Sequence, residues 1–351
     1  MSISTFRPAT SKTVLSSHSR EGGNPLPPKW STAFAGATAI GGPRHWLAAV
    51  FLALTMVRAV WAQTVGVSIP AWIEGSPCEM VPQFEASLNG KRVPVLAQLG
   101  PASDQIILVV FDLTGDLALI DAAKQAVSDQ ISKLPANVWV GLLRDEEGLR
   151  VLVDPGPERA PLIKMIQSLP NSGAPGLLGS VQTALALADA LIRKAPVRVA
   201  VLYLTDSSIY NYREDYTNPV INESDPHDLS RRFPGALIQE KISRLVDAAS
   251  SLEPPLFVVH LNYRRDKLNL VYQNGLETLA EATGGRTSLC RSVAEIPEAI
   301  SGAFARMLNG WRVTLAFPAK LRYNTQIHLS APCRDEALRL SWRTHFHPKG
   351  G

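Results

Sequence analysis

Cysteine is scarce in this sequence, which has three among its 351 residues: Cys78, Cys290 and Cys333. They form neither a Cys-x-x-Cys pair nor a cluster with histidine, the patterns that bind zinc or carry out dithiol exchange. We therefore expect no catalytic cysteine and no thiolate metal centre. An oxidising compartment would allow one disulfide and leave one thiol over, and the sequence does not choose among the three pairings.

A membrane-spanning run is also lacking. The apolar stretch at 46–57 has 12 residues, and no later run reaches the roughly 18 that a spanning helix needs. It follows Arg44 and precedes Val60-Trp61-Ala62, which suits a signal-peptide cleavage site. We predict a signal peptide, a mature chain from Gln63 and a periplasmic or secreted product with no stable membrane span; an uncleaved anchor is the alternative. Residues 1–43, rich in Ser, Gly and Pro, indicate a disordered extension or a misassigned start.

Positive charge is not in excess in the predicted mature chain. The whole chain carries +4, but residues 1–62 hold six basic residues and one acidic residue, so 29 basic and 30 acidic residues follow them. Binding to nucleic acid therefore has no electrostatic basis.

Motifs for two common reaction classes are missing. The sequence has no Gly-x-Ser-x-Gly turn for a nucleophilic serine and no Gly-x-x-x-x-Gly-Lys-Ser/Thr loop for nucleotide phosphates. His260 ends an apolar segment, where a buried structural histidine is the simpler interpretation. The sequence therefore favours a protein that is not an enzyme.

Strands alternate with helices between residues 105 and 310. Residues 105–111 are apolar after the first, which is typical of a strand buried on both faces of a parallel sheet. Helices are indicated by apolar residues at intervals of about three to four. The pattern predicts strands at 105–111, 138–143, 149–153, 197–204, 256–261 and near 288, and helices at 117–134, 160–169, 178–192, 237–252, 276–282 and 296–308. This alternation predicts an α/β fold with a Rossmann-like, mostly parallel sheet and helices on both faces.

Short strands flank this α/β unit. Residues 64–98 and 311–343 contain short apolar segments, and Asn89-Gly90 is a strong hairpin-turn signal because both central positions need positive φ. Each flank is too small to bury a face alone, so we expect the two to pair into a small β subdomain. The predicted organisation is an extension with a signal peptide (1–62), a β lead-in (63–104), the α/β domain (105–310) and a C-terminal β segment (311–351).

Two strands of the predicted sheet end at aspartate. Asp112-Leu-Thr114-Gly-Asp116 follows the strand at 105–111, and Asp206 follows the strand at 197–204. Open parallel sheets bind ligands beyond the carboxyl ends of their strands. Oxygen side chains at every second position of such a turn can converge on a hard cation such as Mg²⁺. These two loops are therefore the candidate site.

On these residues the chain resembles von Willebrand factor A (vWA) domains, and more narrowly the bacterial vWA-related proteins common in acidobacteria. The likeness covers residues 64–343 and includes FEASLNGK, VVFDLTGDL, the helix start near Gly176 and YLTDSS. It implies the vWA fold, binding to a protein partner, and a metal-ion-dependent adhesion site. In that family an Asp-x-Ser-x-Ser loop, a threonine in a second loop and an aspartate in a third form the site.

The site implied by this resemblance is degenerate. Asp112 and Asp206 match the family, Thr114 replaces the first serine and Asp116 stands at the second. Gly176 stands where the threonine is expected, with Ser180 one helical turn later. The resemblance thus implies Mg²⁺, Mn²⁺ or Ca²⁺ bound by Asp112, Thr114, Asp116, Asp206 and Ser180. Three carboxylates would leave a net negative site, which weakens the need for an acidic ligand from a partner.

A metal-free interpretation stays open for the same residues. Asp116 is a favoured N-cap for the helix that follows it. Asp112 and Asp206 can accept hydrogen bonds from backbone amides at the strand ends. The alternative to a cation-dependent binding module is therefore a metal-free structural scaffold.

The VVFDLTGDL segment also resembles the FDLDGTL signature of haloacid-dehalogenase-like phosphatases, with Thr and Asp exchanged. In that family the first aspartate is the nucleophile and the aspartate two residues later is the general acid and base. Here the second position is Thr114, which cannot take that role. A phosphatase is therefore a remote alternative.

A long polar segment, 206–228, follows the second aspartate. It contains Tyr210, Tyr212, Arg213 and Tyr216, and tyrosine and arginine often anchor protein interfaces. Loops of this length are often functional. We predict that these four residues bind a protein partner, with an ordinary solvated loop as the alternative. The predicted function is an exported, adhesion- or assembly-type vWA module.

Overall fold

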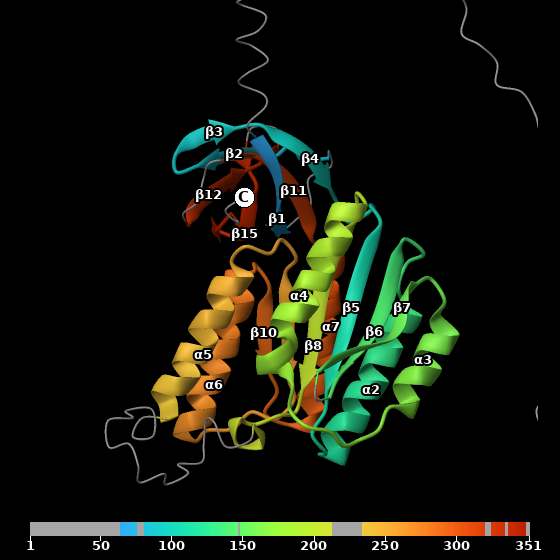
Figure 1. The fold of residues 1–351 in the computed structure, drawn as a ribbon. Coiled ribbons are helices and arrows are strands. Elements are labelled where there is room, and N and C mark those ends of the chain that lie inside the picture. Colours follow the sequence, from blue (N-terminus) through green and yellow to red (C-terminus); the bar gives the residue numbers. More distant parts are fainter. Residues whose placement is uncertain are drawn as a thin grey trace, which may run out of the picture. The chain divides into compact units, whose positions relative to one another are not determined.

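The centre of the fold is a six-stranded sheet in the order β10-β9-β8-β5-β6-β7 (Figure 1). The structure, a computed structural model, describes residues 64–75, 81–146, 148–212, 234–319, 324–333 and 336–348. Neighbouring strands run parallel, except that β7 is antiparallel to β6. Every residue of β8 and β9 is buried, as their continuous apolar runs predict. The strands are β5 (Gln105–Asp112), β6 (Val138–Asp145), β7 (Leu149–Gly156), β8 (Arg198–Thr205), β9 (Leu256–His260) and β10 (Arg286–Leu289).

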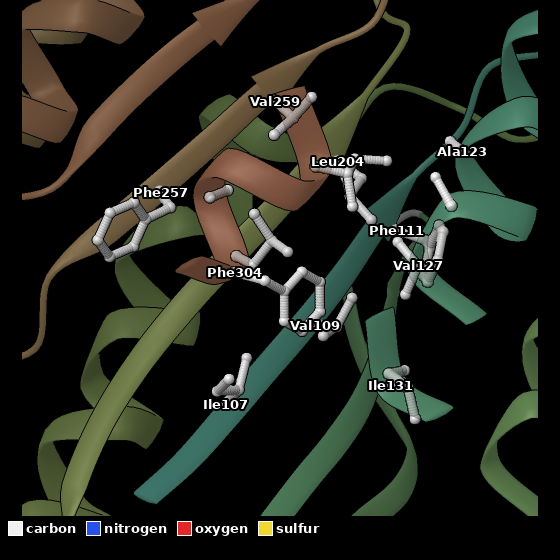
Figure 2. Packing of buried hydrophobic residues seen from close by; sticks show 14 of the residues in the cluster. Ile107, Val109, Phe111, Ala123, Val127, Ile131, Leu204, Phe257, Val259 and Phe304 are labelled. Carbon is white, nitrogen blue, oxygen red and sulfur yellow. The ribbon is translucent and has the colours of Figure 1, made fainter. Parts of the chain in front are cut away.

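Helices cover both faces of this sheet. On one face lie α2 (Leu117–Ser132), α3 (Arg159–Ser168) and α7 (Ile296–Leu308). On the other lie α4 (Leu177–Lys194), α5 (Pro234–Ala249) and α6 (Lys267–Ala282). Figure 2 shows the first of these cores, where side chains of β5, α2 and α7, among them Val109, Val127 and Phe304, meet in one apolar layer. The fold class predicted from the sequence is confirmed.

Helix α6 begins at Lys267, earlier than the predicted start at residue 276. Asp266 caps it by accepting a hydrogen bond from the Asn269 amide at 3.1 Å. The first turns bury polar side chains, because Asn269 accepts from the Ile209 amide at 2.9 Å and Gln273 accepts from the Arg264 amide at 2.8 Å. A search for apolar periodicity misses a helix start whose buried face is polar.

Two antiparallel sheets form the small β subdomain, in the orders β15-β1-β11-β4 and β16-β12-β2-β3. The N- and C-terminal segments pair in it as expected, and both sheets contribute to one core that includes Ile69, Phe84 and Phe317. Asn89 and Gly90 have φ of 48° and 79°, as the hairpin turn requires. The strands are β1 (Thr64–Glu74), β2 (Glu85–Leu88), β3 (Lys91–Val93), β4 (Val95–Leu99), β11 (Trp311–Pro318), β12 (Thr325–Ser330), β15 (Arg339–Trp342) and β16 (His345–Phe346), beside the hairpin β13 (Pro332–Cys333) and β14 (Glu336–Ala337).

Two buried arginines join the subdomain to the α/β unit. Arg198, 4% exposed, donates to the carbonyls of Leu308 at 3.0 Å and Pro101 at 2.9 Å, on the two chain segments that lead to and from the subdomain. Arg343, 1% exposed, donates to the carbonyl of Ser250 at 2.6 Å, just after α5. A guanidinium group offers several donors in a fixed plane, so one side chain can satisfy several backbone carbonyls.

Cys290 is a buried free thiol, and burial raises its pKa to about 11. Cys78 and the side chain of Cys333 lie outside the described residues, as do residues 1–62, so the disulfide and signal-peptide expectations stay predictions. Within the ranges that the structure describes, no helix has the length and apolar character needed to cross a membrane.

Candidate functional site

The loops after β5 and β8 lie side by side at one edge of the sheet. The two strands are hydrogen-bonded neighbours, with Asp112 opposite Thr205. Because both strands are parallel, their carboxyl ends meet at the same edge. The structure therefore brings together Asp112, Thr114 and Asp206, as their positions in the sequence predict.

Asp206 closes the loop after β5. Its Oδ1 accepts hydrogen bonds from the amide and the hydroxyl of Thr114, at 2.6 and 3.0 Å. Its Oδ2 accepts from the amides of Gly115 and Asp116, both at 3.2 Å. The residue is 2% exposed. Both carboxylate oxygens are therefore occupied by donors of a single turn, and hydrogen bonds to a charged acceptor are stronger than neutral ones.

Asp116 serves the helix that follows it. It is the N-cap of α2, and its Oδ1 accepts from the Leu119 amide at 3.5 Å. The preceding Gly115 has φ of 132°, a backbone conformation that residues other than glycine rarely adopt. The structure thus gives Asp116 the capping role that the metal-free interpretation assigned to it.

Asp112 is fully buried beneath this turn, at 0% exposure. Its Oδ1 accepts from the Gly176 amide at 2.9 Å, and its Oδ2 accepts from the hydroxyls of Thr205 at 2.8 Å and Ser207 at 3.3 Å. Burial, followed by the nearby charge of Asp145, raises the pKa of Asp112 to about 7. The hydrogen bonds from Thr205 and Gly176 hold the carboxyl group in place and lower its pKa, but they do not offset the rise in pKa that burial causes.

A second buried acid, Asp145, completes this cluster. It ends β6, is 1% exposed, and its Oδ2 accepts hydrogen bonds from the hydroxyls of Ser180 and Tyr203. Its Oδ1 has no hydrogen-bond partner among the described residues, and burial raises its pKa. The sequence prediction missed Asp145 because it ended the strand at residue 143. The available signal was a third strand that ends at an aspartate.

Ser180 lies on α4 and faces Asp145. Besides its bond to that carboxylate, its hydroxyl oxygen lies 3.1 Å from the Gly176 carbonyl oxygen and 2.6 Å from the Tyr203 hydroxyl. All of these partners belong to this buried network. Ser180, which was predicted to replace the missing threonine hydroxyl, therefore bonds to Asp145.

Gly176 explains why Asp145 can occupy this place. A Cβ atom added at Gly176 would lie 2.1 Å from the Cγ of Asp145, far inside van der Waals contact. The carboxyl group of Asp145 thus fills the space into which a threonine side chain at 176 would project. The missing hydroxyl at position 176 and the buried acid at position 145 are therefore sterically linked.

The segment after Asp206 divides into buried and exposed tyrosines. Tyr210 is 51% exposed, and its hydroxyl donates to Asp266 at 2.8 Å. Tyr212 is only 7% exposed, with its hydroxyl 3.3 Å from that of the buried Tyr272. The prediction that Tyr212 contacts a partner is therefore corrected, because its ring packs in the core beside α4 and α6. Arg213 and Tyr216 lie outside the described residues.

His260 is a structural residue, as the sequence suggests. It is 0% exposed, and its Nε2 lies 2.9 Å from the Ser207 carbonyl. Burial lowers its pKa to about 4, so the ring is neutral near pH 7. A neutral ring with Nε2 protonated can donate to that carbonyl and helps to fix the loop after β8.

No protein-family model and no curated protein matches the sequence. Solved structures do, among them a von Willebrand factor type A protein from Catenulispora acidiphila, at 12% identity and a TM-score of 0.42 over 81% of this chain and 74% of that one. The chain is similar in fold to vWA domains.

The vWF domain of the type V pili tip protein Mfa5 from Porphyromonas gingivalis has 13% identity and a TM-score of 0.38 over 58% of this chain and 94% of its own. The mussel byssus protein PTMP1, solved with a zinc-occupied metal-ion-dependent adhesion motif, has 11% identity and a TM-score of 0.38 over 63% and 49%. At such identities the likeness concerns the fold alone, and the narrower acidobacterial resemblance stays a prediction.

The vWA resemblance implies a divalent cation at this edge, but the side chains do not fit one. Thr114 and Asp206 bond directly to each other, and Asp206 has no oxygen left without a donor. Gly176 supplies no ligand atom, and the space for one is filled by Asp145. Within the described ranges, no three His, Cys, Asp or Glu side chains are grouped so that they could hold a metal. The loop edge is closed by protein donors in place of an ion.

Proposed function

We propose that this chain is an exported protein-binding module of the vWA type, whose contact edge is held in shape by hydrogen bonds and not by a divalent cation. The observation that carries the proposal is the Asp206 carboxylate, which accepts from three consecutive backbone amides and the Thr114 hydroxyl. These bonds order the turn before any partner arrives, which lowers the entropic cost of binding.

Exposed apolar and aromatic side chains on this ordered edge support a binding role. Leu117, the first residue of α2, is 59% exposed, and Tyr210, after β8, is 51% exposed. Tyrosine is among the residues that most often anchor protein interfaces, and Leu117 adds exposed apolar surface at the same edge. Leu117 follows the turn that Asp206 holds, and Tyr210 is fixed by its bond to Asp266. The proposed contact surface therefore combines rigid backbone with accessible side chains.

The burial of the titratable groups argues against catalysis at this edge. Asp112 and His260 are each 0% exposed, so a substrate could not reach them in this conformation. Thr114, at the position of the acid and base in the phosphatase signature, donates its hydroxyl to Asp206. A general acid or base must reach the reacting atoms. The phosphatase alternative therefore has no support from the geometry.

Cation dependence is tested by thermal melts of the purified full-length chain in EDTA and in millimolar Mg²⁺, Mn²⁺ or Ca²⁺. We expect the same melting temperature in all four solutions, because an ion stabilises only when it binds the native state. Asp112→Ala serves as the control. An ion that raises the melting temperature of the wild type but not of Asp112→Ala would overturn the ion-free proposal.

The contact surface is tested with a photo-crosslinking amino acid placed at Tyr210, followed by identification of the captured protein. A matched control carries the same group at Leu96, which is 52% exposed on β4 of the β subdomain. We expect a partner that the Tyr210 position captures and the Leu96 position does not. Equal capture at both positions, or none at either, would favour the structural-scaffold alternative.

A further inference from the structure

Strand β1 has an edge that is only partly paired. On one side, β11 pairs with it from Thr64 to Ala71. On the other side, β15 pairs only from Ala71 to Glu74 (Figure 1). Thr64, Val65 and Gly66 are exposed. Over the first half of β1, therefore, the side away from β11 has no strand beside it among the described residues.

The hydrogen bonds of β1 identify which backbone groups face this edge. The Ser68 amide donates to Glu253 Oε2 at 3.1 Å, and the Pro70 carbonyl accepts from the Arg343 amide at 3.2 Å, both on the side away from β11. Backbone groups of alternate residues point to the same side of an antiparallel strand. The amide and carbonyl of Gly66 therefore face this edge too, and neither has a partner among the described residues.

A groove runs along this edge. It encloses about 320 Å³, which is within the usual range for ligand-binding pockets. Val65, Val67, Phe317, Pro318 and Phe346 give it a largely apolar lining, and Arg193 and Ser251 contribute from the α/β unit. An exposed strand edge beside an apolar groove offers both backbone hydrogen bonds and space for side chains.

Arg193 is the exposed cation beside the groove, and Glu253 is the acid in its lining. Glu253 is already bonded to the Ser68 amide. Arg193 uses one nitrogen for Asp189 at 2.6 Å, and its side chain remains 58% exposed, so the guanidinium retains donors for another acid. An occupant with an acidic residue near one end complements this arrangement.

We propose that the outer edge of β1 binds an extended segment of a partner protein, which adds to the sheet as a strand beside Thr64–Ser68. The segment carries apolar side chains at alternate positions and an acidic residue that meets Arg193. A second folded copy of the chain is the other occupant, and the experiment below distinguishes it. The groove lies near the amino ends of β8 and β9, which Arg193 and Ser251 precede, whereas the Asp206 loop lies at their carboxyl ends. The proposal therefore goes beyond the function proposed above and does not depend on it.

The test selects peptides from a random phage-displayed library on the full-length chain and measures their affinities for two variants at one position. Gly66→Pro removes the amide donor, and proline is tolerated where an edge amide faces outward. Gly66→Ala keeps the amide and is the matched control. For peptides with alternating apolar residues we expect affinity at least about tenfold weaker with Gly66→Pro and nearly unchanged with Gly66→Ala. Hydrogen exchange of the Gly66 amide should also slow when the peptide is bound.

Arg193→Gln provides a second measurement if Gly66→Pro does not fold. We expect it to weaken selected peptides that contain an acidic residue and to leave their uncharged analogues unaffected. The proposal is wrong if no peptide is enriched, or if enriched peptides bind Gly66→Pro as well as the wild type. It is equally wrong if the Gly66 amide is already protected in the free chain, or if the edge proves to mediate dimers that Gly66→Pro dissociates.

Discussion

The Asp206 carboxylate illustrates how much one side chain contributes to the loop edge, since three amides and a hydroxyl depend on it. We predict that Asp206→Asn lowers the free energy of unfolding by about 3 kcal/mol, because the amide group removes the charge and turns a donor toward backbone donors. Urea denaturation followed by circular dichroism measures the change. Asp116→Asn is the control and should cost less than about 0.5 kcal/mol, because asparagine caps helices as well as aspartate does. Equal losses in the two variants would contradict this account.

Asp112 makes the stability of the protein depend on pH. Burial, with the nearby Asp145, raises its pKa in the folded chain to about 7, compared with about 4 in the unfolded chain. Between these values the folded chain keeps a proton that the unfolded chain has lost, so stability falls as pH rises, by about 1.4 kcal/mol per pH unit for this group. Below the unfolded pKa both states are protonated and the stabilisation is complete; above pH 7 it is lost.

Asp112→Asn isolates this effect. Urea denaturation of the wild type and the variant between pH 4.5 and pH 7.5 should show the wild type losing stability relative to the variant as pH rises. The expected loss is a few kcal/mol, because roughly two to three pH units of this range lie below the pKa of Asp112 in the folded chain. Titrating groups far from Asp112 contribute equally to both proteins and cancel in the difference. A difference that does not change with pH would show that Asp112 titrates normally.

At the scale of elements, the end of β6 and the start of α4 are matched to each other. Asp145 ends the strand, Gly176 precedes the helix, and a Cβ atom at Gly176 would overlap the Asp145 carboxyl group. We predict that Gly176→Thr alone costs about 3 kcal/mol or more, since overpacking in a rigid interior is destabilising. In an Asp145→Ala background the same change should cost less than about 1 kcal/mol, a coupling that a double-mutant cycle measures by denaturation. Additive effects would refute the steric link.

The elements themselves follow the sequence to different degrees. The continuous apolar runs of β5 and β8 and the periodic helices α4 and α7 lie where the pattern predicts them, because burial on a fixed period dictates both sequence and structure. The start of α6 escaped prediction, since its buried Asn269 and Gln273 are polar and depend on partners in distant loops. The burial of Tyr212 escaped for the same reason, because its neighbour Tyr272 lies on α6.

At the scale of the whole molecule, Arg343 anchors the β subdomain to the end of α5. It donates to the carbonyls of Ala249, Ser250 and Leu252, and also to that of His345. We predict that Arg343→Met lowers the free energy of unfolding by about 3 kcal/mol, because these buried carbonyls lose their donor. The exposed Arg339→Met should stay within about 0.5 kcal/mol of the wild type in the same denaturation experiment. If both variants were equally stable, the anchoring role would be refuted.

The sequence alone determined the α/β class, the pairing of terminal β segments, and the meeting of Asp112, Thr114 and Asp206 at one sheet edge. These features follow from hydrophobic period, from turn chemistry and from the rule that parallel strands end together, all of which are local or topological. Only the tertiary structure decided how the acids are used. Whether Asp206 accepts backbone amides, and whether Asp145 fills the space beside Gly176, depends on contacts between residues far apart in the chain. Such contacts leave no period in the sequence, because a single distant side chain of the right size and charge is enough to make them.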